Sequence, residues 1–159
     1  MDEHRIIPAY DHINDIRTLF QEYITVEYEK KRGIQLGFQH IEEEIESLPG
    51  SYAEPTGGLF LLYWSENIAG CAAFRKINHS SCELKRLYIR EQFRGFKLGH
   101  KLLYHTLSEA KKKGYIYAYC DTLSTMTEAI TIYRKMGFVE TEPYYENPLH
   151  GVLYFKKTL

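Results

Sequence analysis

The sequence predicts a mixed α/β fold in which helices cover both faces of one sheet. Three apolar segments, 59–64, 68–76 and 83–89, follow one another with only short polar turns between them, which is typical of antiparallel strands. A helical pattern then separates the third segment from a fourth strand at 115–122, and such a strand–helix–strand unit makes its two strands parallel. The chain of 159 residues is expected to form a single domain, 1–159, with about seven strands and four helices.

The composition argues against several kinds of partner. Lys and Arg number 20 against 21 for Asp and Glu, so no electrostatic argument favours nucleic acid or a membrane surface. No apolar run approaches the ~20 residues of a membrane helix, and no apolar leader segment is present. Cys71, Cys82 and Cys120 are scattered, and His100 and His105 fall on different helix faces. We therefore expect a cytoplasmic protein with reduced thiols and no metal site.

The N-terminal half is expected to contain a strand and two helices. Arg5–Ala9 has the pattern of a short strand, and Asp11 is a good N-cap for an amphipathic helix that starts near Ile13. The basic run Lys30–Gly33 should end this helix. A second helix is predicted over Phe38–Leu48, and its acidic run is either a solvated face or an attraction for a cationic amine.

The C-terminal half should contain two more helices and the remaining strands. The first of these helices should end at Gly114, directly after three lysines. Thr125 and Glu128 have the spacing of a capping box for the next helix, which Gly137 should end. A final strand pair follows, and Val152–Lys156 is its last strand.

A binding site is indicated by the tight turn between the strand 83–89 and the helix after it. The turn, residues 94–99 (RGFKLG), leads directly into the helix, so successive N–H groups and the positive helix end should point at one place. Arg94, Lys97, His100 and Lys101 add positive charge nearby. The pattern predicts a phosphate site, and the alternative is a plain turn with solvated basic residues.

The same six residues resemble the Arg/Gln-x-x-Gly-x-Gly/Ala loop of the GNAT acyl-CoA-dependent N-acyltransferases, with Lys97 in place of the usual middle glycine. The segment 125–138 (TMTEAITIYRKMGF) is similar to the closing helix of that family, and the predicted order of elements matches its fold over nearly the whole chain. The chain also resembles a bacterial subgroup of acetyltransferases without assigned substrates, in the segments 48–52 (LPGSY), 82–88 (CELKRLY) and 143–148 (PYYENP).

The resemblance implies an N-acetyltransferase that moves an acetyl group from acetyl-CoA to a primary amine of a small molecule or peptide. Transfer would be direct, in a ternary complex, and a homodimer is possible. The coenzyme A pyrophosphate would lie on the turn, and the pantetheine would lie along the preceding strand as an added strand. The residues implied for cofactor binding are Leu87, Tyr88, Ile89, Arg94, Gly95, Phe96, Lys97, Leu98, Gly99, His100 and Thr125.

Two residues are candidates for the proton transfers. Tyr133 lies four residues before Gly137 and matches the family tyrosine that approaches the cofactor sulfur; a phenol with a pKa of about 10 suits a leaving thiolate. The alternative is an ordinary core tyrosine. Glu83 matches a catalytic glutamate of some relatives and would be the base. Its alternative role is structural, paired with Lys85, Arg86 or a loop amide, with water taking the proton.

Other positions complete the expected site. The Leu87 N–H would polarise the acyl carbonyl as an oxyanion donor. Tyr145 and Asn147 lie on a proline-flanked loop and are expected near the amine acceptor, although such aromatic residues also pack in ordinary loops. Lys97 and Met126 depart from the family pattern, which leaves open a second function: a coenzyme A-binding regulatory domain with little or no activity. A flat protein-interaction domain is a third possibility.

Overall fold

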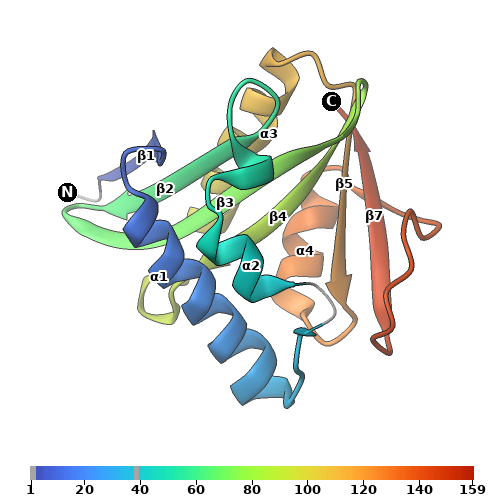
Figure 1. Ribbon diagram of the computed structural model, residues 1–159, viewed down its shortest axis with the longest axis horizontal. Coiled ribbons are helices and arrows are strands. Elements are labelled where there is room, and N and C mark those ends of the chain that lie inside the picture. The colour runs from blue at the N-terminus through green and yellow to red at the C-terminus, as the bar shows by residue number, and fades with distance from the viewer. Residues whose placement is uncertain (1–2, 38–39) are drawn as a thin grey trace.

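The computed structural model describes residues 3–37 and 40–159, and its strands form one seven-stranded sheet in the order β1-β2-β3-β4-β5-β7-β6 (Figure 1). The pairs β2–β3 and β3–β4 are antiparallel and the pair β4–β5 is parallel, which confirms the predicted mixed sheet. The strands are β1 His4–Pro8, β2 Gly58–Trp64, β3 Asn67–Asn78, β4 Ser81–Ile89, β5 Tyr117–Leu123, β6 Val139–Thr141 and β7 Val152–Thr158.

Helices cover both faces of the sheet, with α1 and α2 in front of it in Figure 1 and α3 and α4 behind it. Each layer buries its own apolar cluster: Phe74, Leu102 and Phe155 lie in the cluster behind, and Phe20 and Tyr52 lie in the cluster in front. The helices are α1 Ile13–Tyr23, α2 Ile41–Glu46, α3 Leu98–Lys112 and α4 Thr127–Lys135, with 3₁₀ turns at Gly50–Tyr52 and Glu91–Phe93.

The segment after α1 differs from the prediction of a plain amphipathic helix. α1 continues into a π-helix, Ile24–Lys30, which buries Glu27 and Tyr28. Such π segments occur often at functional sites, because the wider turn re-aims its side chains. The second helix is shorter than the predicted Phe38–Leu48, and Phe38 itself lies outside the described residues.

Two predictions about helix caps are wrong. The N-cap of α1 is His12 instead of Asp11, and it makes no side-chain capping bond. α4 starts at Thr127 with Met126 as its N-cap, so Thr125 and Glu128 form no capping box. The side chains of that pair are engaged by arginines from other elements, which compete with the local capping bonds.

β4 and β5 pair only at their beginnings. The register joins residues 81–83 of β4 to residues 117–119 of β5 and extends to no further described residue. Figure 1 shows the two strands separating from that end. The edge of β4 that faces β5 is therefore open along residues 84–89, which include the positions where the family resemblance implies the pantetheine.

A β-bulge sits in the open part of β4. Residues 86–87 together oppose Ala72 of β3, and Arg86 has a φ of 58°, a conformation that costs a non-glycine residue free energy. A two-pronged ion pair holds Arg86 in place: Nε lies 2.9 Å from Glu44 Oε2 and Nη2 lies 3.1 Å from Glu44 Oε1. This buried pair between α2 and β4 stabilises the distorted strand at its open edge.

Candidate active site

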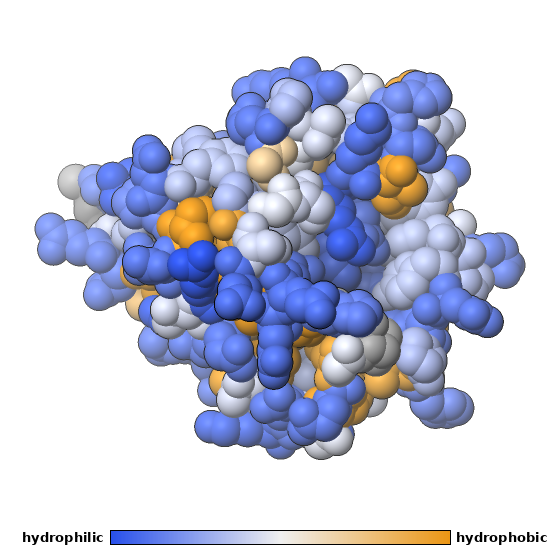
Figure 2. All heavy atoms as spheres, viewed as in Figure 1, coloured by the Kyte–Doolittle hydropathy of each residue, from blue (hydrophilic) through white to orange (hydrophobic). Residues whose placement is uncertain are grey.

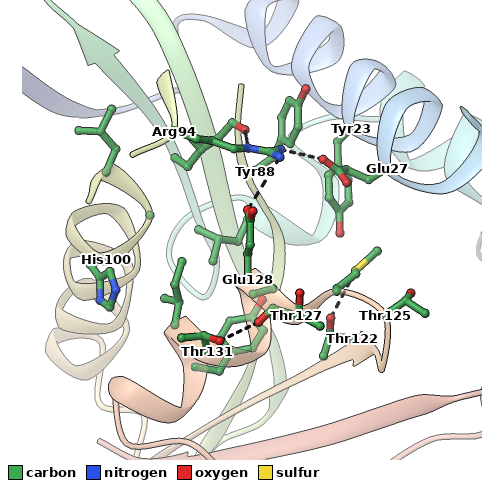
Figure 3. A pocket seen from close by; sticks show the side chains of 18 of the residues that line it. Tyr23, Glu27, Tyr88, Arg94, His100, Thr122, Thr125, Thr127, Glu128 and Thr131 are labelled. Atoms are coloured by element: carbon green, nitrogen blue, oxygen red, sulfur yellow. Dashed lines mark hydrogen bonds and ion pairs between the residues drawn. The ribbon is translucent and has the colours of Figure 1, made fainter. Parts of the chain in front are cut away.

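A cavity of about 500 Å³ lies between the open edge of β4, the start of α3 and the start of α4 (Figure 3). The π-helix contributes to its wall. Predicted site residues that line the cavity are Leu87, Tyr88, Ile89, Arg94, Gly95, Lys97, Leu98, Gly99, His100, Thr125 and Tyr133. Predicted residues outside its lining are Phe96, Glu83, Tyr145 and Asn147.

The start of α3 presents backbone donors beside the cavity. Among the described residues, no backbone acceptor is hydrogen-bonded to an N–H group of residues 95–100. Gly95 has a φ of 94° and Lys97 a φ of 59°, so the chain enters the helix through left-handed residues. Lys97 thus adopts a left-handed conformation that is more favourable for glycine than for lysine. Unpaired N–H groups at the positive end of a helix are suited to bind an anion.

Arg94 is held by carboxylates at the edge of this cavity (Figure 3). Its Nη2 donates to Glu27 Oε1 at 2.7 Å, its Nε donates to the Ile89 carbonyl at 2.9 Å, and Nη1 lies 4.0 Å from Glu128 Oε2. Burial raises the pKa of Glu27, but hydrogen bonds from Arg94 and Lys31 outweigh burial and leave that pKa below its ordinary value. Arg94 therefore joins the π-helix to α4.

Two further cofactor candidates have partners that the sequence did not indicate. Thr125 Oγ1 accepts a hydrogen bond from Arg32 Nε at 2.9 Å, which ties the end of the π-helix to the loop before α4. The Phe96 ring is 47% exposed and stacks on Trp64, with ring centroids 5.0 Å apart. The Phe96 side chain therefore lies outside the cavity, while its backbone stays in the turn.

Tyr133 is the predicted proton donor, and it is buried in α4 with its side chain among the cavity-lining residues. Its ring packs against Phe138 and Phe155, with centroids 5.5 and 6.0 Å away. Burial, followed by the nearby Cys120, raises its pKa well above the ordinary 10. The hydroxyl is consequently neutral at any physiological pH, and it is a weaker acid than the phenol expected from the sequence.

Glu83 is the predicted base, and it is 3% exposed. Oε1 lies 2.8 Å from Arg75 Nε, and Oε2 accepts a hydrogen bond from the Tyr144 hydroxyl at 2.7 Å. The ion-pair partner is thus neither Lys85 nor Arg86, the two cations considered from the sequence. Burial raises the pKa of Tyr144, so its hydroxyl remains a donor to Glu83.

Tyr145 and Asn147 both bind Asp121 of β5. The Tyr145 hydroxyl donates to Asp121 Oδ2, and Asn147 Nδ2 lies 3.3 Å from the same oxygen. Asp121 lines the cavity, so the loop predicted near the acceptor is anchored to the cavity wall through it. Asp121 belongs to no motif in the sequence, although the alternation of its strand places it on the same face as Tyr119.

Within residues 3–37 and 40–159, no group of three or more His, Cys, Asp or Glu side chains is arranged to hold a metal ion. None of the helices in this described part is both long and apolar enough to span a membrane. Cys71, Cys82 and Cys120 are buried and form no disulfide.

Parallel strands that separate beside the N-terminus of a helix form the architecture of acyl-CoA-dependent acyltransferases, and this protein is an acyltransferase of that class. A sequence model of the acetyltransferase (GNAT) family matches residues 13–138. The chain therefore belongs to the GNAT family, as its turn and its closing helix indicated.

Individual relatives agree with this assignment. An uncharacterized N-acetyltransferase from Dictyostelium discoideum is 30% identical and aligns over 96% of this chain and 97% of its own length. An acetyltransferase structure from Streptococcus agalactiae has a TM-score of 0.79 at 19% identity, covering 98% of both chains. A GNAT acetyltransferase from Elizabethkingia anophelis with acetyl-CoA bound has a TM-score of 0.66 at 21% identity, covering 100% of both chains. These two structural likenesses show the shared fold.

Proposed function

We propose that this protein transfers an acetyl group from acetyl-CoA to a primary amine of a small molecule or peptide, directly and in a ternary complex. One observation carries the proposal: the unpaired N–H groups of residues 95–100, the open edge of β4 and Tyr133 all adjoin one cavity. A thioester of coenzyme A needs an anion site for its phosphates, an open strand edge for its pantetheine and a proton donor for its sulfur.

The residues present fit acetyl-CoA as the donor substrate. The N–H groups after Arg94 would bind the pyrophosphate, with Lys97 adding positive charge. The edge at residues 87–89 would hold the pantetheine through backbone hydrogen bonds, as an added strand. The similar fold from Elizabethkingia anophelis carries acetyl-CoA, which supports this reading. When bound, the thioester supplies an activated acyl group.

The proposed transfer can be written as steps in which every bond and proton is accounted for. The amine nitrogen attacks the thioester carbonyl carbon, the C–N bond forms, and the C–S bond breaks with its electron pair remaining on sulfur. The Leu87 N–H would stabilise the oxyanion, and the Tyr133 hydroxyl would give its proton to the sulfur. Glu83, through Tyr144 or a water molecule, would take the proton that an ammonium acceptor must lose first. The proton shed by nitrogen after attack reaches the Tyr133 phenolate and restores its hydroxyl, and the proton first taken up by Glu83 or water passes to solvent.

The acceptor should enter beside Tyr145 and Asn147, because both are anchored to Asp121 at the cavity wall. We also propose that the protein acts in the cytoplasm, where three buried unpaired thiols are stable. The homodimer implied by the family stays a prediction.

A thiol-release assay with acetyl-CoA and a panel of amines tests the proposal. We expect release that depends on both substrates, together with acetyl-CoA-dependent thermal stabilisation by mass action. Stabilisation without release from any amine would contradict the enzymatic proposal and favour the coenzyme A-binding regulatory domain. The absence of both effects would contradict cofactor binding itself.

A further inference from the structure

The front face of the sheet carries a polar floor where β4 and β5 begin to separate. Glu83 pairs with Tyr119, so alternation places Lys85 and Asp121, two residues further along each strand, on the same face. Their strand neighbours Cys82 and Cys120 belong to the apolar cluster behind the sheet, so this face is the front one. No helix lies in front of β5 in Figure 1, and Figure 2 shows a hollow with a strongly hydrophilic floor in this area.

Lys85 is a buried cation that no carboxylate of the described residues contacts directly. It is 9% exposed, and among the described residues its ammonium makes no ion pair and no hydrogen bond. Burial, followed by the nearby Arg86, lowers its pKa, whereas Glu83 and Asp121 oppose that shift. Among the described residues, Tyr52 Oη is the one fully sealed side-chain polar atom without a hydrogen bond, so the Lys85 ammonium is not completely sealed from solvent. A buried charge without a partner costs stability and is typical of a ligand site.

The other charges of this floor are matched within the protein. Glu83 is paired with Arg75, and Glu44 is paired with the guanidinium of Arg86. Asp121 accepts hydrogen bonds from the loop 143–148 but has no ion pair among the described residues. Asp121 and Lys85 interact electrostatically without touching. One face that carries an anion and a cation, neither of them in an ion pair among the described residues, is complementary to a zwitterion.

We propose that the acceptor is an amino acid with a free carboxylate, which Lys85 binds while Asp121 directs the amino group toward the thioester. The proposal rests on the proposed function and specifies its acceptor. The position suits the chemistry, because Lys85 and Asp121 flank the point where the β4–β5 pairing stops, and Asp121 also lines the cofactor cavity. A simple cationic amine would leave Lys85 unmatched, and an acceptor with only negative charge would be repelled by Asp121.

The test compares each common amino acid with its α-carboxamide, which keeps the amine and loses the carboxylate. In the thiol-release assay we expect wild-type kcat/KM for the amino acid to exceed that for the carboxamide by about tenfold to a hundredfold. Lys85→Met should raise the KM for the amino acid by about tenfold and change kcat/KM for the carboxamide by less than about twofold. The matched control, Lys76→Met, removes an exposed lysine from β3 and should change neither.

Two readouts separate a binding role from a structural one. The Tm of Lys85→Met should equal or exceed that of the wild type, because an unmatched buried cation is replaced by an apolar chain of similar length. Its Kd for acetyl-CoA, measured by calorimetry, should stay within about twofold, because the cofactor contacts are main chain. A clear fall in Tm would assign Lys85 a structural role and overturn the proposal.

The outcomes distinguish this inference from the proposed function. If the wild type uses carboxamides as well as amino acids, the acceptor assignment is wrong and acetyl transfer stands. If Lys85→Met weakens both acceptors alike, the carboxylate contact is likewise excluded. If no compound releases thiol although acetyl-CoA binds, the proposed function fails, and the acceptor assignment fails with it.

Discussion

The proposed cofactor side of the cavity is made mostly of main chain, whereas the proposed acceptor side, next to the cavity, is made of charged and tyrosine side chains. The cofactor side comprises the open edge 84–89 and the N–H groups of residues 95–100, which are close together in sequence. The acceptor side brings together Lys85, Asp121 and Tyr144 from two strands and a distant loop. A donor substrate that stays the same can be held by backbone geometry, while selection among amines needs side chains that can be exchanged.

The first prediction concerns Tyr133, where the two sides meet. Tyr133→Phe should lower kcat by about a hundredfold to a thousandfold, because the departing thiolate loses its proton donor. The Kd for acetyl-CoA should be unchanged, since this hydroxyl is not part of the phosphate site. Stopped assays of thiol release and calorimetry measure the two quantities. Tyr104→Phe, at a 67% exposed position on α3, is the matched control and should change neither.

The pH dependence of kcat adds a second test of the same residue. Because burial raises the pKa of Tyr133 well above 10, the hydroxyl keeps its proton as the pH rises to 10. Wild-type kcat should therefore show no decline near pH 10 from loss of this proton. A descending limb that appears there and disappears in Tyr133→Phe would contradict the buried, neutral phenol.

The second prediction concerns the support of the acceptor side. Glu44→Gln leaves the buried Arg86 without its carboxylate and should lower the free energy of unfolding by about 3 kcal/mol. The amine KM should rise as well, because Arg86 holds the bulge next to Lys85. Urea unfolding and amine kinetics measure these effects. Glu43→Gln removes an exposed carboxylate on α2 whose only ion pair among the described residues is with His40, and it should change stability by less than about 0.5 kcal/mol. Equal effects from the two variants would show that the Arg86–Glu44 pair has no special role.

The same division explains what the sequence could predict. The order of elements along the chain and the turn 94–99 follow from local patterns of periodicity, glycine spacing and helix ends, whereas the place of Tyr133 was implied by the family resemblance. Each of these patterns acts over a few residues. The strand and turn of the proposed cofactor side form one contiguous stretch, so these elements could be predicted from the sequence.

The features that the sequence missed depend on contacts between distant segments. Glu27 is a single acid in an ordinary helical pattern, and only the π-helix turns it toward Arg94, 67 residues away. Asp121 is bound by Tyr145 and Asn147 of the loop 143–148, which is more than twenty residues away in the sequence. The capping box at Thr125 failed for the same reason, because Arg32 competes for its hydroxyl. Propensity and spacing cannot predict which arginine reaches a given side chain.

The third prediction tests the one ionic cluster on the cofactor side. Glu27→Gln leaves Arg94, Lys31 and Arg32 without their shared carboxylate and should cost about 2 kcal/mol of stability at pH 7. The folded-state pKa of Glu27 lies below its ordinary 4.5, so its contribution is complete above pH 4.5 and is lost as the pH falls through the folded value. The difference between wild type and variant in urea unfolding should therefore shrink below pH 4.5. A difference that does not vary with pH would rule out this titration.

The same variant, Glu27→Gln, should lose stability but bind acetyl-CoA more tightly. Glu27→Gln releases Arg94 and removes a negative charge near the turn, so binding should tighten about threefold or more at low salt. Weaker binding would mean that Glu27 positions Arg94 for the phosphates instead of competing with them.

The fourth prediction has the smallest expected effect and separates main chain from side chain on the cofactor side. Lys97→Gly removes a side chain from a residue at a φ of 59°, which should raise the free energy of unfolding by up to about 1 kcal/mol. The N–H groups of the turn remain, so the Kd for acetyl-CoA should rise only about threefold, and less at high salt, because one exposed ammonium is lost. The matched control is Lys101→Ala, because alanine preserves the helix where glycine would weaken it. This variant should leave the affinity for acetyl-CoA nearly unchanged. A loss of affinity beyond about thirtyfold would mean that the lysine side chain binds the diphosphate and the backbone does not. The proposed cofactor side would then depend on a side chain as well as on main chain, at the position where this chain departs from the family pattern.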